Sequence, residues 1–463
     1  MSNVALDKEY PLYIPENFDI DKLVQENPPT FPYHRDYFIY IVHLITDIPI
    51  RNKKDDDVLY VSLHSSLLQR RVRKYNLYLK YLVENKVLVC DNQYIKRKKS
   101  KGYKFYDNYE TEIIETSITK TTLIKSIKQY IHIDYSQEDN QEGETINDGS
   151  DLNNLSKWFN DKLTVDFLSA KQYLRELRET EQNIFSDEFS PNAMRRYNSR
   201  LIPLIKLNTQ NFAHTIDYTA GRMHTALTQL KSDLRPYIKY DGKTLVAVDI
   251  TNSQPYLSTI LFNSDKYDEY QILSRIRMYN RTYHSNPYYP NFAPYYLRKN
   301  IENATQHEDV FNYIDIVKSG ELYERFGELL QQRGLVNEEK PIRKQAKEII
   351  FSAIFSPNQA IAYNDAVKIF EENFPNVYEI FRSIKQNEHR TLACVLQNLE
   401  AYLVLHTACR IITERRPDIP LFTLHDAIIT TSGNEDFVEY VLSNVLNDAI
   451  GFPPTLKIEP WIG

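Results

Sequence analysis

Cysteine is scarce in this chain: three occur among 463 residues, and they lie far apart. Cys90, Cys394 and Cys409 form no Cys-x-x-Cys pair. This number and spacing exclude a disulfide-stabilised scaffold and argue against a zinc site. Chains without paired cysteines are typical of a reducing compartment, so we expect a cytoplasmic protein.

Long apolar runs are also absent. No uninterrupted hydrophobic segment approaches the length of a membrane span, and the N-terminus lacks the apolar core of a signal peptide. The sequence has no internal repeat and no strong excess of one charge: its formal net charge is −6, with 42% hydrophobic and 25% charged residues. These values predict a globular protein without a membrane partner, long enough for two or three domains.

Two aspartates stand at the ends of strand-like segments. Within residues 245–259, four apolar residues lead directly into Asp249, which predicts a short buried strand with a carboxylate at its solvent end. Residues 420–431 predict a tight hairpin with His425 and Asp426 at its tip. Many α/β proteins end a core strand with aspartate, so one such pattern is ordinary. Two strand-borne aspartates, however, are what two-metal nucleotidyl transfer requires.

The N-terminal part divides into an arm and a patterned segment. Residues 1–30 are polar and contain several prolines, so we expect an irregular arm. Residues 31–133 show a helix, a strand, two helices and two strands in that order, and this order resembles the winged helix-turn-helix family. The resemblance implies a recognition helix over residues 74–85. The basic loop between the last two strands would contact DNA phosphates through Lys96, Arg97, Lys98, Lys99 and Lys101.

The alternative for this segment is a winged helix that contacts protein, with its lysines merely solvated. The density of basic residues in the loop favours nucleic acid. Residues 134–152 are acidic and aperiodic, which predicts a flexible linker. Residues 153–211 have helical periodicity with many basic residues. They form either a packing layer or a thumb-like region beside a duplex.

A stripe of two cations and two aromatic residues follows further along the chain. Arg343, Lys347, Phe351 and Phe355 recur every four residues and so share one face of a helix. By themselves, the two phenylalanines would be core residues. Bracketed by the two aspartates, however, the stripe resembles motif B of the family-A polymerases, which include bacterial repair DNA polymerases and single-subunit phage-type RNA polymerases.

The resemblance covers residues 212–463, with motifs A, B and C in the family's order. It implies an α+β right-hand fold, in which an antiparallel palm sheet carries helical fingers. Asp249 and Asp426 would hold two Mg²⁺ ions, with Mn²⁺ as an alternative. Arg343 and Lys347 would hold the triphosphate of the incoming nucleotide, and Lys347 would also donate a proton to pyrophosphate.

Other positions follow from the same resemblance. The remaining nucleotide-binding residues would be Phe351, Phe355, Gln254 and His425. The nucleic-acid contacts of this region would be Arg222, Arg235 and Gln397. The first palm element matches either residues 220–222 or residues 225–230, and both registers stay open. The next element of the family is an arginine-bearing strand, which Arg235 would fill.

Several departures from the family bear on the sugar of the nucleotide. Ala427 replaces the Glu that DNA polymerases carry after the motif C aspartate. Gln254 replaces the Glu that excludes the ribose 2′-hydroxyl, and because it is still bulky we expect it to favour deoxynucleotides by steric exclusion. Phe355 and Ser356 stand where motif B has Tyr and Gly. Arg and Tyr alternate through residues 275–298, which suits either stacking on unpaired bases or a rigid packed loop.

These features favour a compact DNA polymerase without a proofreading exonuclease, belonging to a phage, plasmid or other mobile element. Its partners would be a DNA primer–template and deoxynucleoside triphosphates. One alternative is an RNA-synthesizing polymerase or primase. Another is a non-catalytic DNA-binding replication initiator, which the presence of Asp249, Asp426, Arg343 and Lys347 disfavours.

Overall fold

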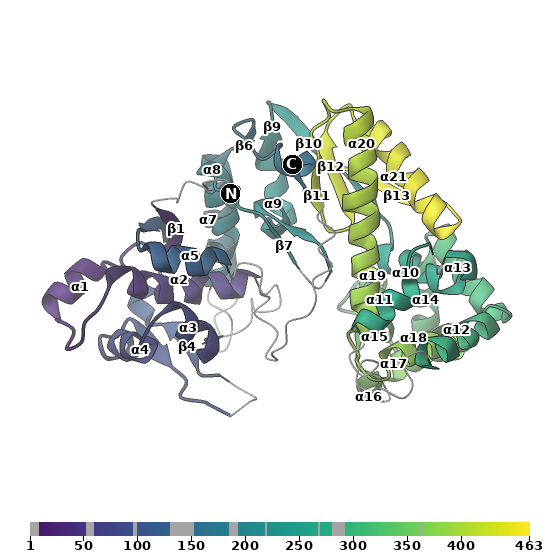
Figure 1. Cartoon of the computed structure of the whole chain (residues 1–463), viewed down its shortest axis with the longest axis horizontal. Coiled ribbons are helices and arrows are strands. Elements are labelled where there is room, and N and C mark those ends of the chain that lie inside the picture. Colours follow the sequence, from purple (N-terminus) through teal and green to yellow (C-terminus); the bar gives the residue numbers. More distant parts are fainter. Residues whose placement is uncertain are drawn as a thin grey trace.

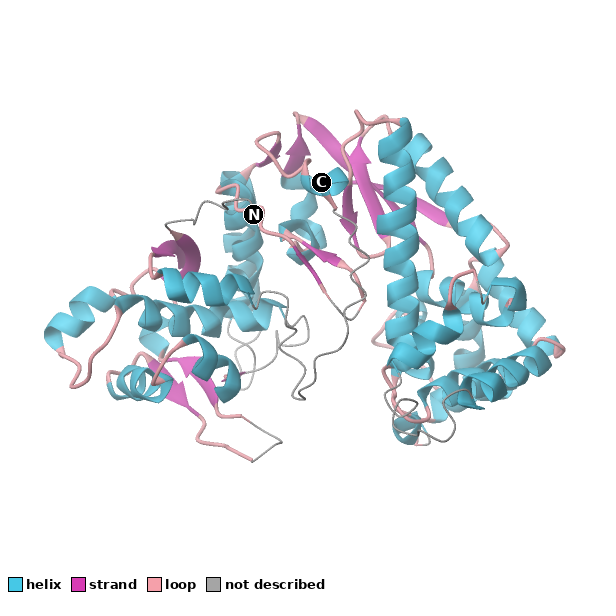
Figure 2. Cartoon of the chain, in the orientation of Figure 1, coloured by secondary structure: helices cyan, strands magenta, loops and turns pink. Residues whose placement is uncertain are grey.

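The chain combines many helices with antiparallel sheets (Figures 1 and 2). Figure 1 shows an N-terminal body at one end, the largest sheet in the middle and a helical lobe at the other end. This computed structural model describes residues 9–51, 60–95, 100–129, 152–184, 193–217, 220–266, 269–279, 292–361 and 363–463.

The N-terminal body has its own hydrophobic core, which includes Phe38, Leu68 and Leu82. Strands β2, β4 and β3 form a three-stranded antiparallel sheet in that spatial order, and β1 pairs with β5. The elements of this body are β1 (Tyr10–Pro15), α1 (Ile20–Glu26), α2 (Arg35–Arg51), β2 (Val61–Ser62), α3 (Ser65–Arg71), α4 (Tyr75–Glu84), β3 (Leu88–Cys90), β4 (Gly102–Phe105), β5 (Ile113–Ile118) and α5 (Thr121–Gln129). From α2 to β4 the order is the one expected from the sequence.

The expectation of an irregular arm over residues 1–30 is wrong for β1 and α1. Strand β1 tolerates its two prolines because it belongs to a two-stranded sheet, and β5 lies about a hundred residues away in the sequence, so local pattern could not reveal the pairing. Helix α1 starts where the Asp19 side chain accepts hydrogen bonds from the N–H groups of Asp21 and Lys22.

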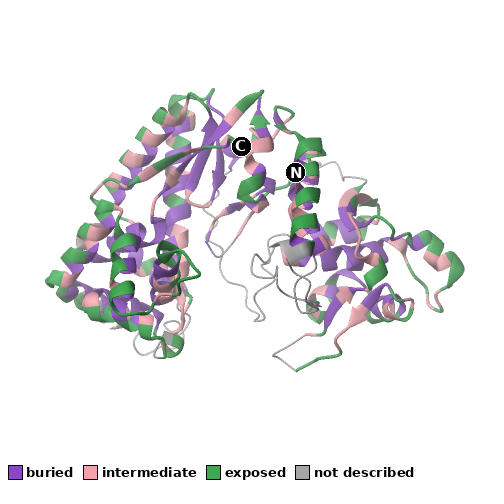
Figure 3. Ribbon diagram, turned by 180° about the vertical axis from the view of Figure 1, so that it is seen from behind, coloured by how far each residue is buried: buried purple, intermediate pink, exposed green. Residues whose placement is uncertain are grey.

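The central sheet has six strands: β6 (Leu163–Val165), β9 (Ile238–Tyr240), β10 (Lys243–Ile250), β11 (Phe422–Leu424), β12 (Ala427–Thr431) and β13 (Leu456–Pro460). Their order is β11-β12-β10-β9-β6, and β13 also pairs with β10, so β10 lies at the centre. Both faces of β10 are covered. Leu245 and Ala247 join one hydrophobic cluster, whereas Val248 and Ile250 join another. Strands β10, β11 and β12 are largely buried, whereas β13 is partly or fully exposed along its length (Figure 3).

We expected residues 153–211 to be helical throughout, but they are not. They contain α6 (Asn153–Ser156), α7 (Phe167–Ile184) and α8 (Ala193–Asn208), but also β6, which pairs with β9. Short elements then lead to the sheet: β7 (Thr215–Ile216), β8 (Met223–His224) and α9 (Ala226–Gln229). The region therefore extends the central sheet as well as covering it.

The helical lobe is built from α10 (Ser253–Ser258), α11 (Ile272–Tyr279), α12 (Phe292–Ala304), α13 (Glu308–Ser319), α14 (Leu322–Gln332), α15 (Ile342–Phe355), α16 (Asn358–Ile361), α17 (Asp365–Asn373), α18 (Pro375–Lys385), α19 (Thr391–Ala401), α20 (Cys409–Arg415) and α21 (Glu435–Ile450). Residues 315–326 resemble the family helix just before motif B, but they do not form one continuous helix. Gly320, at φ +77°, instead ends α13, and a new helix begins two residues later.

Helices α19 and α20 are joined through a π-helical segment, Tyr402–Ala408, into one long helix. This helix, Thr391–Arg415, is long and apolar enough to cross a membrane by length and composition. It is not an uninterrupted apolar run, because it contains Gln397, Asn398 and Glu400. Its most apolar stretch is 67% buried inside the protein, as in the core helix of a globular fold.

Candidate active site

Asp249 lies near the end of the central strand β10, half-buried between two neighbouring strands. In the antiparallel register it stands opposite Ala427 of β12 on one side and opposite Lys457 of β13 on the other. Residues directly opposite each other in such a ladder point to the same face of the sheet. The side chains of Asp249, Ala427 and Lys457 therefore share one face.

Asp426 belongs to the two-residue turn of the β11–β12 hairpin. Leu424 pairs with Ala427, which leaves His425 and Asp426 at the tip, and His425 has a left-handed backbone conformation at φ +56°. Ala427 pairs with Asp249 across the two strands, and Asp426 directly precedes Ala427 in the chain. Strand pairing thus brings together two acids that are far apart in the sequence.

Electrostatics agree with this juxtaposition. Burial raises the pKa of Asp249 to about 7, and the charge of Asp426, followed by that of Glu459, adds to the rise; Lys347 and Lys457 oppose it. The Ser253 hydroxyl at the start of α10 donates a hydrogen bond to Asp426 Oδ2 at 2.5 Å. The negative charge of Asp426 therefore disfavours ionisation of Asp249.

The acids suit Mg²⁺ by the chemistry of their donor atoms. No group of three or more His, Cys, Asp or Glu side chains that could hold a metal ion occurs in the part of the chain that the structure describes. Mg²⁺ does not need such a cage, because it usually binds through one or two carboxylates and keeps water or substrate phosphate oxygens as its other ligands. Asp249 and Asp426 match that requirement.

Helix α15 brings the predicted cationic stripe toward the acids. Lys347 is exposed and contributes to the electrostatics of Asp249. Its Nζ lies 5.3 Å from the centre of the Phe351 ring, and the rings of Phe351 and Phe355 meet edge to face at 5.4 Å. Both phenylalanines are half-buried against the core of the lobe. They therefore pack partly as core residues and keep part of their surface accessible.

Arg343, one turn earlier, is engaged by α14. Its Nε donates to Glu324 Oε1 at 2.6 Å, and its guanidinium lies 5.3 Å from the centre of the Tyr323 ring. The ion pair is about half exposed, with 54% and 48% of the two side chains accessible. Such a pair contributes little stability, so an anionic ligand could replace Glu324 at small cost.

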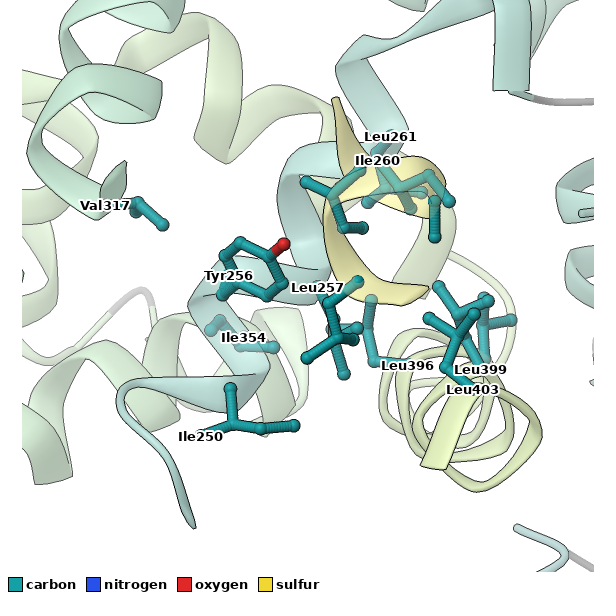
Figure 4. Close-up of a cluster of buried hydrophobic side chains, with 14 of the residues drawn as sticks. Ile250, Tyr256, Leu257, Ile260, Leu261, Val317, Ile354, Leu396, Leu399 and Leu403 are labelled. Atoms are coloured by element: carbon teal, nitrogen blue, oxygen red, sulfur yellow. The ribbon is translucent and has the colours of Figure 1, made fainter. Parts of the chain in front are cut away.

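A common hydrophobic cluster holds the site's elements in place. Figure 4 shows Ile250 of β10, Leu257 of α10, Ile354 of α15 and Leu399 of α19 in this cluster. Each of these apolar residues lies within four positions of a candidate site residue. Packing of the apolar side chains thereby fixes the relative positions of the strand and helices that carry the polar ones.

A buried polar network lies behind the acids. Glu400 of α19 has 1% of its side chain exposed, and it accepts hydrogen bonds from Nε and Nη2 of Arg222 and from Nε2 of Gln254. Burial raises the pKa of Glu400 to about 7, with Arg222 opposing the rise and Asp426 adding to it. The network joins the turn before β8 to α10 and α19.

The hydrogen bonds to Glu400 restrict the side chains of Gln254 and Arg222, two of the predicted site residues. Gln254 is 6% exposed and bound to Glu400, so it does not project freely toward a nucleotide. Arg222 also uses two of its nitrogens on Glu400. Their predicted roles in sugar exclusion and duplex contact remain predictions, and each would require the side chain to act while anchored.

Three further predicted residues lie in different surroundings. Arg235 was predicted to lie in a strand, but it lies in the 3₁₀ turn Ser232–Tyr237, and the strand β9 begins only after this turn. Its guanidinium packs 5.6 Å from the centre of the Trp461 ring. Gln397 is half-buried on α19, next to Asn398, which accepts a hydrogen bond from Arg275. His425 is half-buried at the hairpin tip.

The predicted basic loop cannot be compared in full. Lys96, Arg97, Lys98 and Lys99 lie outside the described residues, whereas Lys101 is exposed just before β4. The linker prediction also falls almost entirely outside them, as does the middle of the Arg- and Tyr-rich segment. At the start of that segment, Arg275 lies 5.4 Å from the centre of the Tyr402 ring.

Sequence reasoning missed several residues of the site: Ser253, Glu324, Glu400, Lys457 and Glu459. Ser253 follows Asp249 by four positions and could have been suspected as a polar neighbour in the turn. Lys457 and Glu459 would have required the register of β13 against β10, which the sequence does not reveal. Glu400 stands within a largely apolar segment, and an acidic residue in such a segment was the one signal that the sequence offered.

Comparisons with known proteins add little. No protein-family model matches the chain, and no curated protein matches it. Among solved structures, it is similar to the POL domain of Pol1 from M. smegmatis in complex with a DNA primer–template and dNTP, with 10% sequence identity and a TM-score of 0.27. The match covers 67% of this chain and 66% of the length of that domain.

Proposed function

We propose that this chain is a template-directed nucleotidyltransferase, namely a compact DNA polymerase without a proofreading exonuclease. One observation carries the proposal: Asp249 of β10 lies within electrostatic range of Asp426, which stands in the turn before the neighbouring strand β12. Asp249 also lies within range of Lys347, on a helix that carries Arg343 and two aromatic rings. An acid pair that repels itself is suited to bind divalent cations, and cations on an adjacent helix are suited to bind a triphosphate.

The reaction joins the 3′-oxygen of a primer to the α-phosphorus of a nucleotide and breaks the bond from that phosphorus to pyrophosphate. When bound, two Mg²⁺ ions would lower the pKa of the 3′-hydroxyl and neutralise charge on the leaving group. Asp249 and Asp426 would hold these ions. Ser253 orients Asp426 through its hydrogen bond.

Helix α15 supplies the remaining charge stabilisation. Arg343 exchanges its half-exposed contact with Glu324 for phosphate oxygens, which its planar guanidinium can bind in bidentate fashion. Lys347 binds the same phosphates and donates a proton to the departing pyrophosphate. Phe351 and Phe355 offer the partly exposed ring surfaces against which a base or sugar can pack.

The N-terminal body would hold DNA as a winged helix-turn-helix. The order α2–β2–α3–α4–β3–β4 and the antiparallel sheet of its strands support this. Exposed cations lie just before α4, at Arg73 and Lys74, and before β4, at Lys101. Such positions suit phosphate contacts on both sides of the helix.

A second candidate is RNA synthesis, by a polymerase or primase. Gln254, which we expected to exclude a ribose 2′-hydroxyl, is buried and bound to Glu400, and Phe355 has no hydroxyl. Both features weaken the case for discrimination against ribonucleotides. The choice between the two sugars is therefore the first question for experiment.

The test is incorporation of labelled dNTPs and rNTPs on primed and unprimed DNA and RNA templates, with Mg²⁺ or Mn²⁺. Template-dependent extension with dNTPs supports the DNA polymerase, and extension or initiation with rNTPs supports the second candidate. The absence of any incorporation, together with retained DNA binding, would leave a non-catalytic initiator and overturn the proposal.

A further inference from the structure

The edge strand β13 adds a cation to the face that carries the acids. Lys457 stands directly opposite Asp249 in the β10–β13 register, so the two side chains point to the same face of the sheet. Lys457 is 65% exposed, which leaves its ammonium accessible to a ligand. Lys457 is thus the basic residue that pairs with Asp249 across the two strands.

Lys457 also interacts electrostatically with Asp249 and with Arg343 of helix α15. Its charge lowers the pKa of Asp249, and its own pKa is raised by the hydrogen bond to Glu459 and by Asp249, while Arg343 opposes that rise. The β10–β13 register places Lys457 beside Asp249 on one face of the sheet. A phosphate group bound at Asp249 on this face would therefore lie close to the Lys457 ammonium.

Glu459 keeps the lysine in position. It lies two residues further along β13, opposite Ala247, and hence on the same face. Its Oε1 is 2.5 Å from Lys457 Nζ. The pair is partly solvated, and such ion pairs contribute little stability. A phosphate dianion, with more charge and more acceptor oxygens than a carboxylate, would compete well for the same ammonium.

We propose that Lys457 is a phosphate-binding residue of the candidate active site, and that Glu459 holds it until a phosphate takes its place. The inference rests on the proposed function and extends it to a strand outside the three motifs. The phosphate belongs either to the nucleoside triphosphate or to the backbone of the primer–template. Both sources present the same chemistry, and binding measurements separate them.

The experiment measures binding by the full-length protein without turnover, using a dideoxy-terminated primer–template and Mg²⁺. One arm titrates the labelled primer–template, and the other titrates a nucleoside triphosphate into the complex. Lys457→Met should weaken one arm by roughly 5–10-fold, the value of one charge-assisted contact at a partly exposed site. Lys457→Arg should stay within about twofold of the wild type.

The remaining variants test the competition and the specificity. Glu459→Gln should tighten the arm that Lys457→Met weakens, since it releases the ammonium. Lys368→Met is the matched control, because Lys368 forms a similar exposed ion pair with Asp365, at 2.8 Å on α17. Thermal unfolding of each variant verifies folding.

Equal affinities for wild type and Lys457→Met in both arms would overturn the inference, and so would loosening by Glu459→Gln. If the wild type still incorporates nucleotides in that case, the proposed function stands without Lys457. If the wild type neither binds nor incorporates nucleotides, the proposed function and this inference both fall.

Discussion

At the scale of single residues, the character of Asp249 comes from its neighbours on the two flanking strands. Ala427 on one side leaves room beside the carboxylate, and Lys457 on the other side supplies a counter-charge. Burial and the nearby Asp426 raise the pKa of Asp249 to about 7. A cation bound between the two acids would relieve their repulsion.

Replacing either acid by its amide should remove catalysis and spare the fold. We expect Asp249→Asn and Asp426→Asn each to lower incorporation by at least about 10³-fold, because a neutral amide is a poor Mg²⁺ ligand. Primer–template affinity should change by less than about threefold. Filter binding and primer extension on the same preparations measure both quantities. Activity near the wild-type level in either variant would contradict the assignment.

Glu400 gives a prediction about pH and stability. Its pKa is raised from 4.5 to about 7 by burial, so the folded state holds a proton that the unfolded state releases. The stabilisation linked to this proton is complete below about pH 4.5 and is lost as the pH rises through about 7. In Glu400→Gln, a neutral isostere, this dependence disappears.

The measurement is the free energy of unfolding of wild type and Glu400→Gln from pH 4.5 to 8. Relative to the variant, the wild type should lose on the order of 3 kcal/mol across that range, from 1.36 kcal/mol per pKa unit. Parallel pH profiles for wild type and Glu400→Gln would show that Glu400 does not titrate in this range.

At the scale of elements, α15 is the helix that the function needs most. Its buried residues Ala346, Ile350 and Ile354 pack into the lobe core, and Arg343 and Lys347 lie exposed beside this buried face. The alternation of these faces follows from helical periodicity alone. Apolar packing therefore positions the helix, and the contacts of Arg343 with Glu324 and Tyr323 position one of its cations.

Removing the cations of α15 should affect nucleotide use more than DNA binding. Lys347→Ala and Arg343→Ala should each raise the KM for the nucleotide or lower kcat, with a loss of at least about tenfold in kcat/KM, since each removes a charge-assisted contact to phosphate. Arg325→Ala is the matched control: Arg325 forms an exposed ion pair with Glu321 at the start of α14. Steady-state extension kinetics measure the effect, and a loss in Arg325→Ala as large as that in Arg343→Ala would argue for a non-specific effect of charge.

The α13–α14 boundary gives a stability prediction. Gly320 has φ +77°, and a Cβ there would lie 3.1 Å from Thr455 Oγ1. Gly320→Ala should therefore lower the free energy of unfolding by roughly 1–2 kcal/mol. Gly334 has a similar φ of +66° with nothing within 4 Å, so Gly334→Ala should cost less. Urea denaturation compares the two, and equal losses would rule out a contribution from Thr455.

At the scale of the whole molecule, the N-terminal body is fixed by contacts with the helices that cover the central sheet (Figure 1). Arg195 of α8 binds Glu110 at 2.8 Å, and Asn198 of α8 donates to the carbonyl of Thr111. Glu112 is bound by Lys171 and by the Tyr197 hydroxyl. DNA held by this body would thus have a set orientation relative to the acids.

Weakening these contacts should loosen the N-terminal body without unfolding it. Arg195→Ala leaves Glu110, whose side chain is 10% exposed, without its ion-pair partner, and should cost roughly 2–3 kcal/mol at the interface. Hydrogen exchange should rise in β5 and α8 and stay unchanged in α15. Arg410→Ala, which removes an exposed ion pair with Glu414, is the control. Unchanged exchange in β5 would show that the interface does not depend on Arg195.

The sequence determined the local features of this protein. Short-range patterns predicted the apolar run before Asp249, the hairpin with Asp426 at its tip and the four-residue stripe of α15, because strand and helix periodicities are local. The helix–strand order of the N-terminal body from α2 to β4 was predictable for the same reason. Errors arose where distant segments decide the outcome, as for β1, which forms only against β5, and β6, which forms only against β9.

Only the tertiary structure decided what surrounds the acids. The register of β13 places Lys457 opposite Asp249, and the packing of α19 buries Glu400 against Arg222 and Gln254. Neither pairing has a local signature, because partners in a sheet or a buried network are chosen by long-range packing and not by spacing along the chain. The sequence therefore supplied the reactive groups, and the fold supplied their neighbours, whose charge and burial set how those groups ionise and bind.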